Sequence, residues 1–117
     1  METTAVKYND LVREPEDKKG VTVASGTAYT AGMLLVSDAG ADFAHSAVAL
    51  STAAGYNTQE IGVLLENVDA TGGAEETVVA LGGKFNRANV FIKSGQVEAD
   101  INGVLQAKNI LLEDWSK

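Results

Sequence analysis

The sequence predicts a small, compact domain of mixed but predominantly β structure, with one C-terminal helix and a flexible N-terminal arm. Two apolar runs, residues 61–70 and 77–81, flank a Gly-containing loop at 71–76, which is typical of a β-hairpin. Later in the chain, apolar residues recur at helical spacing over residues 97–105. The first residues, 1–20, are mostly polar or charged and show neither period.

The composition limits the size of the core and its make-up. A chain of 117 residues forms one domain, long enough for a single core. With only three Phe, three Tyr and one Trp, the core must be built from Val, Leu, Ile and Ala. Twelve Gly and a single Pro fit a fold with many tight turns.

The charge and the missing residue types exclude several functions. A formal net charge of −7 argues against a nucleic-acid partner, because affinity for phosphate backbones comes largely from Lys and Arg. The chain has no Cys, which excludes disulfides, thiol chemistry and Cys-ligated metals. No apolar stretch approaches the roughly 20 residues that cross a bilayer, and residues 1–4 lack the blocks of a signal peptide. We therefore expect a protein made in the cytoplasm, with no membrane partner and no cofactor.

Residues 1–20 differ in kind from residues 21–117, which we expect to form a single β-rich domain. The arm contains the only Pro, Pro15, inside the charged run 13–20. Such a run cannot bury enough apolar surface to offset its own ordering entropy. Residues 6–12 contain enough β-forming side chains to become a strand when a partner supplies a template. We expect the arm to be mobile in the free protein and ordered against a partner.

Within the domain, short apolar runs alternate with turn residues. Strands are expected at residues 21–23, 33–36, 61–65 and 77–81, with a returning strand formed by Phe43 and residues 47–50. Gly82 and Gly83 are expected to break the sheet. One or two further short strands are expected at residues 84–85 and 89–92.

The C-terminal part of the domain has the period of a helix. Four apolar residues fall at positions i, i+4, i+7 and i+8 and so share one helical face: Val97, Ile101, Val104 and Leu105. Gly103 costs this helix about 1 kcal/mol relative to Ala, so packing must hold it. Asn109 tolerates the left-handed conformation and is expected to end the helix. Residues 110–112 then form a last short strand or a docked tail.

No group of residues in the sequence predicts catalysis or metal binding. His45 is the only His, which leaves no partner for a two-His metal site, and a loop or surface imidazole is the better interpretation. Residues 38–42 lack the later ligands of a calcium loop and are interpreted as a β-turn. Glu75 and Glu76 are adjacent, so their carboxylates point apart and stay solvated. Neither Gly-Gly pair lies between a strand and a helix, as a phosphate-binding loop requires.

Trp115, the only Trp, lies close to the C-terminus between polar residues. Two interpretations stay open for it. Its ring is either a plug on the domain's own core or an anchor in the pocket of a partner.

The order of segments over about residues 29–112 resembles the head decoration (capsid cement) proteins of tailed bacteriophages, the family of the phage lambda decoration protein. A polar arm comes first, as it does in that family. The segments that carry the resemblance are YTAGMLLV at 29–36, a short hairpin about 38–43, IGVLL at 61–65, VDAT at 68–71, TVVALGGKF at 77–85 and an Asn-Val step at 89–90. A C-terminal helix and strand follow. The tail, residues 113–117, departs from the family's usual apolar ending by being polar and aromatic.

This resemblance implies a β-tulip-like domain, commonly a homotrimer, bound to the outside of the expanded capsid. There it would cement the lattice of the major capsid protein as a virion structural protein without enzymatic activity. In that family the N-terminal arm orders on the shell by pairing its backbone with a capsid strand. The capsid-binding candidates that follow are Val6, Tyr8, Asn9, Leu11 and Val12. Three arms on one trimer would act at high effective concentration, so weak single contacts would suffice.

Two alternatives remain at this stage. One is a fibre-base, adaptor or glycan-binding module of a virion or surface assembly, although 6% aromatic residues leave few platforms for stacking on sugars. The other is a small enzyme, for which the sequence offers no catalytic constellation.

Overall fold

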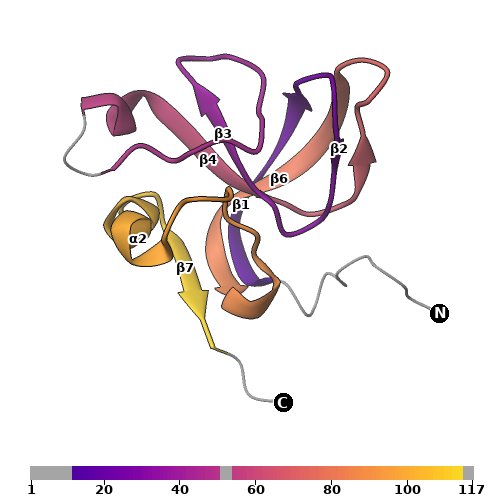
Figure 1. The fold of residues 1–117 in the computed structure, drawn as a ribbon. Helices are drawn as coiled ribbons and strands as arrows, with labels where there is room; N and C mark the ends of the chain where they lie inside the picture. Colours follow the sequence, from indigo (N-terminus) through magenta and orange to yellow (C-terminus); the bar gives the residue numbers. More distant parts are fainter. Residues whose placement is uncertain (1–11, 51–53, 115–117) are drawn as a thin grey trace.

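The computed structural model describes residues 12–50 and 54–114, and it forms a predominantly β domain with one α-helix in these ranges (Figure 1). The predicted fold class is thereby confirmed. The strands are β1 (Val12–Val23), β2 (Ala28–Tyr29), β3 (Leu34–Asp38), β4 (Gln59–Leu64), β5 (Val68–Asp69), β6 (Glu75–Asn86) and β7 (Ile110–Glu113). The helices are the 3₁₀ turns η1 (Ala54–Thr58) and η2 (Arg87–Asn89) and the α-helix α2 (Glu98–Ala107).

Strand β6 is the centre of a five-stranded sheet. One of its edges pairs antiparallel with β1 from Val12↔Phe85 to Val23↔Glu75. Its other edge pairs first with β4, antiparallel, and then with β7, parallel. β3 pairs antiparallel with β4 and completes the sheet, while β2 and β5 form a separate two-stranded ribbon. The predicted hairpin between residues 61–70 and 77–81 is confirmed where β4 pairs with β6. It is wrong at residues 68–69, which form β5 and pair with β2 instead of with β6.

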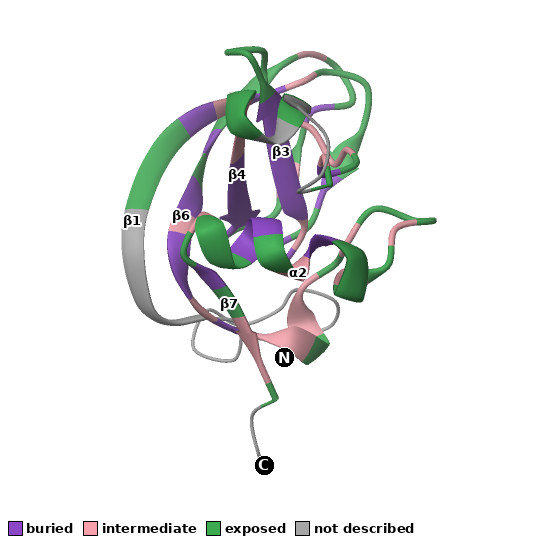
Figure 2. Ribbon diagram, turned by 90° about the vertical axis from the view of Figure 1, so that its left-hand side faces the viewer, coloured by how far each residue is buried: buried purple, intermediate pink, exposed green. Residues whose placement is uncertain are grey.

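The sheet is buried on both faces, which explains why its central strands are apolar at consecutive positions. Neighbours in one strand belong to opposite sides of the core: Leu34 and Leu35 in β3, and Val79 and Ala80 in β6. One core cluster contains Leu34, Ala80 and residues of α2, and the other contains Leu35, Val79 and residues of the β2–β5 ribbon. Figure 2 shows α2 lying over one face of the strands.

The predicted helical face is confirmed at three of its four positions. Ile101, Val104 and Leu105 are fully buried on α2. Val97 precedes the first turn and is 57% exposed, so its assignment to the buried face was wrong. Asn109 adopts φ 63°, the left-handed conformation expected of the residue that ends a helix.

Two predicted strand features differ from the structure. The returning strand formed by Phe43 and residues 47–50 is reduced to a single antiparallel bridge between Val36 and Ala44, and β3 pairs with β4. The backbone of Val48 is hydrogen-bonded by the side chain of Gln96 and not by a strand. Gly82 and Gly83 do not break the sheet, since both lie within β6. Gly83 adopts φ 135°, and irregular register in β1 opposite this region lets β6 continue through the pair.

Residues 89–92 also form no strand of their own. Asn89 ends the turn η2, and Phe91 makes an isolated parallel bridge with Met33. The segment therefore extends the sheet by a single bridge only.

The predicted boundary of the N-terminal arm is also corrected. β1 begins at Val12, so residues 12–20 are part of the sheet rather than of a free arm. Charge does not prevent this, because an edge strand is ordered by backbone hydrogen bonds while its side chains can face solvent. Pro15 lies in the irregular register between Arg13 and Asp17, where a residue without an amide hydrogen is tolerated. Val6, Tyr8, Asn9, Leu11 and Trp115 lie outside the described residues.

Candidate functional site

The outer side of β1 is an edge of the five-stranded sheet. β1 is the edge strand of the sheet, so one side of its backbone pairs with β6 and the other faces outward (Figure 2). Towards its C-terminal end this outer side is covered. The amide of Phe43 donates to the carbonyl oxygen of Thr22 at 2.9 Å, and the amide of Ala24 donates to the carbonyl oxygen of Phe43 at 2.8 Å.

These two hydrogen bonds establish which backbone groups of β1 point outward. Backbone groups of successive residues in a strand alternate between its two sides, so Gly20 presents its N–H and C=O on the same side as Thr22. These hydrogen bonds with Phe43 do not extend to Gly20, because the chain preceding Phe43 turns back to β3. No strand or bridge in the described ranges pairs with this side of Gly20.

A hollow of about 550 Å³ opens beside this edge. In the β1–β6 register, Gly20 lies opposite Val78 and Thr22 lies opposite Glu76, so these four residues share one face of the ribbon. Gly20, the residue of β1 directly opposite Val78, has no side chain to cover it, and Val78 is 37% exposed. The hollow therefore combines an apolar floor with direct access from the open edge.

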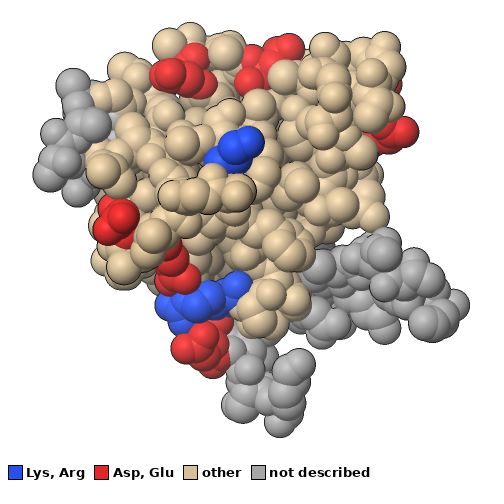
Figure 3. All heavy atoms as spheres, in the orientation of Figure 1, with Lys and Arg blue, Asp and Glu red and all other residues tan. Residues whose placement is uncertain are grey.

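The hollow is acidic. Glu66, which follows β4, and Glu76 both line it, and the lining residues that the structure describes include no Lys or Arg. The hydroxyl of Thr77 donates to Oε2 of Glu66 at 2.9 Å and holds that carboxylate beside β6. Figure 3 shows one face of the molecule, on which acidic side chains are more numerous than basic ones, in keeping with the net charge of −7. A cationic group is the natural complement of the hollow.

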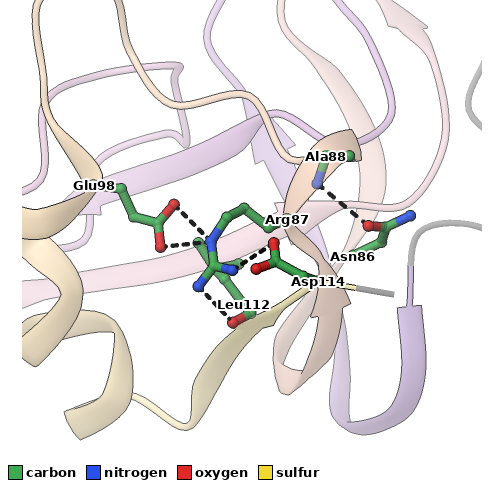
Figure 4. A network of polar contacts seen from close by, with 6 residues as sticks. All are labelled: Asn86, Arg87, Ala88, Glu98, Leu112 and Asp114. Atoms are coloured by element: carbon green, nitrogen blue, oxygen red, sulfur yellow. Dashed lines mark hydrogen bonds and ion pairs between the residues drawn. The ribbon is translucent and has the colours of Figure 1, made fainter. Parts of the chain in front are cut away.

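A second polar cluster holds the C-terminal strand in place and has no feature of a catalytic site. Arg87, in η2, contacts Oε2 of Glu98 at the start of α2 at 2.9 Å and Oδ1 of Asp114 at 2.7 Å, and donates to the carbonyl oxygen of Leu112 at 3.0 Å (Figure 4). The hydrogen bonds that Arg87 donates to the carboxylates of Asp114 and Glu98 raise the pKa of Arg87 above its ordinary value. One guanidinium thus joins η2, α2 and the end of β7.

The residues weighed in the sequence lie apart from one another. Nδ1 of His45 lies 3.1 Å from the carbonyl oxygen of Leu34, in a half-buried loop. Glu75 and Glu76 are exposed at the start of β6. In residues 38–42, Ala39 (φ 53°) and Gly40 (φ 87°) form the turn after β3. Within the part of the chain that the structure describes, no three acidic or His side chains are grouped to hold a metal ion.

The sequence drew attention to Glu76 only as half of an adjacent acidic pair, and it did not identify the other residues of the acidic hollow. Gly20 fell in the segment interpreted as an arm, and Val78 and Glu66 belonged to runs interpreted only as strands and turns. Their common position depends on the register of β1 against β6, for which the sequence has no local signal. No helix in the described ranges has the length and apolar character that a bilayer crossing requires.

Comparison with known proteins adds no assignment. A scan against protein-family models finds none that matches this chain, and a search of curated proteins finds no match either.

Proposed function

We propose that this chain is a structural protein of a bacteriophage virion. It binds the outside of the expanded capsid as a homotrimer and stabilises the lattice of the major capsid protein, without enzymatic activity. The observation that carries the proposal is the order of the sequence segments that resemble head decoration proteins.

Those segments coincide with the elements that build the sheet. IGVLL at 61–65 contains most of β4, and TVVALGGKF at 77–85 makes up most of β6. VDAT at 68–71 contains β5 and a turn in which Oδ1 of Asp69 accepts hydrogen bonds from the hydroxyl of Thr71 at 2.6 Å and from its amide at 3.0 Å. These bonds lower the pKa of Asp69 from its ordinary value. The resemblance thus rests on residues that shape the domain, which supports a likeness of fold.

The position of β1 gives a second line of support. Residues 1–11 lead directly into an edge strand, and an edge strand is the geometry through which β-augmentation operates. The capsid-binding residues proposed from the resemblance precede or begin this strand, and Val12 is its first residue.

The alternative, a glycan-binding or adaptor module, has less support. Sugar sites use aromatic side chains as stacking platforms. Among the large apolar side chains whose exposure the structure describes, Phe91 is the one aromatic that is exposed, at 44%.

The proposal is tested by sedimenting the purified chain with expanded, DNA-free shells assembled from the major capsid protein of the genome that encodes it. We expect saturable binding. The ratio of bound chain to major capsid protein should match the number of equivalent positions on the icosahedral lattice. Unexpanded shells serve as the control and should bind far less. A chain that stays in the supernatant with both kinds of shell contradicts the proposal.

The role of the arm is tested in the same assay by deleting residues 2–11, which leaves β1 intact. We expect occupancy of expanded shells to fall at least tenfold, since the main-chain pairing is lost. Unchanged occupancy would remove residues 6–11 from the binding mechanism.

A further inference from the structure

We propose that the outer edge of β1 at Gly20 binds an extended peptide segment that carries an Arg or Lys side chain. The peptide pairs its backbone with Gly20, and its basic side chain lies across Gly20 into the acidic hollow. This inference requires only a polypeptide partner, and it does not depend on the proposed function.

The first argument is the open backbone. Gly20 presents its N–H and C=O outward on the side that Phe43 covers at Thr22. A strand added here extends the backbone pairing that Phe43 makes with the outer side of β1. It supplies partners for two backbone groups of Gly20 that have none in the described ranges. Main-chain hydrogen bonds supply the affinity of such β-augmentation, and side-chain pockets beside the edge supply its selectivity.

The second argument is the shape of the hollow. A side chain from an added strand reaches Val78 only if the residue between them on β1 is small, and Gly20 meets this condition. The hollow of about 550 Å³ has room for one long side chain, whose methylene groups contact Val78.

The third argument is charge. Glu66 and Glu76 both line the hollow, and none of the described residues that line it is basic. Lys19, the neighbour of Gly20 in β1, has its Nζ 3.0 Å from Oε1 of Glu60, and does not line the hollow. A long side chain with an apolar stem and a cationic head therefore fits both Val78 and the two carboxylates of the lining, and Arg and Lys are the side chains of this kind.

The experiment titrates the isotope-labelled full chain with a blocked pentapeptide, Thr-Val-Arg-Val-Thr, at low ionic strength and follows the amide resonances by NMR. The matched control peptide has Gln in place of Arg. We expect saturable shifts at Gly20, Thr22 and Val78, and a dissociation constant about fivefold lower for the Arg peptide, as exposed ion pairs allow. Equal affinities for the two peptides, or shifts that map elsewhere, overturn the proposal.

Two variants separate the side-chain pocket from the backbone edge. Gly20→Leu fills the hollow, and the space around Gly20 admits it, because the nearest atom to an added Cβ is the carbonyl oxygen of Thr77 at 4.0 Å. We expect at least tenfold weaker binding of the Arg peptide. Gly72→Leu, in a turn with no atom within 4 Å of an added Cβ, is the matched control and should bind as the parent does.

Glu76→Gln keeps the shape of the hollow and removes a charge. We expect it to raise the dissociation constant of the Arg peptide about threefold and to leave the dissociation constant of the Gln peptide unchanged. This variant tests the pocket even where Gly20→Leu alters the fold. Shifts at Gly20 that depend on protein concentration without peptide would identify a second copy as the occupant and overturn the proposal.

Discussion

The side chain of Gln96 occupies the place of a strand partner for Val48. The amide of Val48 donates to Oε1 of Gln96 at 3.0 Å, and Nε2 of Gln96 donates to the carbonyl oxygen of Val48 at 2.8 Å. Val48 is 3% exposed and belongs to the core cluster under α2. One carboxamide therefore satisfies both backbone groups of a buried residue in a segment that forms no strand.

We expect Gln96→Ala to lower the free energy of unfolding by about 1–3 kcal/mol, because two backbone groups of a buried residue lose their partners. Urea denaturation measures the change. Gln106→Ala, at an exposed position on α2, is the matched control and should change stability by less than about 0.5 kcal/mol. Equal effects of the two substitutions would show that the pair with Val48 contributes little.

Gly32 and Gly40 form a matched pair for separating backbone strain from steric conflict. Both have positive φ, 98° and 87°. A Cβ at Gly32 would lie 2.1 Å from the carbonyl oxygen of Asn89, whereas a Cβ at Gly40 would meet nothing within 4 Å. We expect Gly40→Ala to cost about 1–2 kcal/mol and Gly32→Ala at least about 3 kcal/mol, since the second must also displace backbone. Thermal and urea unfolding of both variants check the difference, and similar losses would contradict it.

Gly103 is a site where a substitution should stabilise the protein. It lies within α2, it is exposed, and an added Cβ meets no atom within 4 Å. Gly103→Ala should raise the free energy of unfolding by about 0.5–1 kcal/mol, because Ala loses less conformational entropy on forming a helix. A fall in the urea midpoint would instead indicate a contact on this face of α2.

Tyr29 should make the stability of the fold sensitive to alkaline pH. Burial, and to a smaller extent the charge of Asp42, raise the pKa of Tyr29 above its ordinary value of 10.0. A pKa that is higher in the folded state means that the folded state holds the proton more tightly than the unfolded chain does. Its contribution to stability is complete below pH 10 and is lost as the pH rises through the folded-state pKa.

The substitution Tyr29→Phe tests this pH dependence. The variant loses the hydrogen bond that the hydroxyl donates to the carbonyl oxygen of Ala24 at 2.8 Å, so it should be about 1 kcal/mol less stable at neutral pH. Above pH 10 the difference in free energy of unfolding between parent and variant should become smaller, as measured by urea unfolding at a series of pH values. A gap that stays constant would show that Tyr29 does not titrate between the two states.

The sequence was sufficient where a signal is local. The helical spacing of Ile101, Val104 and Leu105 identified the buried face of α2, because one turn of a helix brings these positions together. Asn109 marked its end, because the conformation required there is a property of a single residue. The apolar runs in β4 and β6 identified central strands, because a sheet covered on both faces needs apolar residues at consecutive positions.

Only the tertiary structure decided which strands pair and where the open edge lies. Val97 fitted the helical pattern but precedes the helix, and residues 47–50 fitted a strand pattern but are held by Gln96. The charged segment 12–20 became part of β1 through backbone pairing with β6, and backbone groups are the same in every residue type. The acidic hollow exists because this pairing brings Gly20 opposite Val78, 58 positions away along the chain. Such pairing depends on the fit of the whole sheet, and it leaves no periodic pattern in the residues that take part.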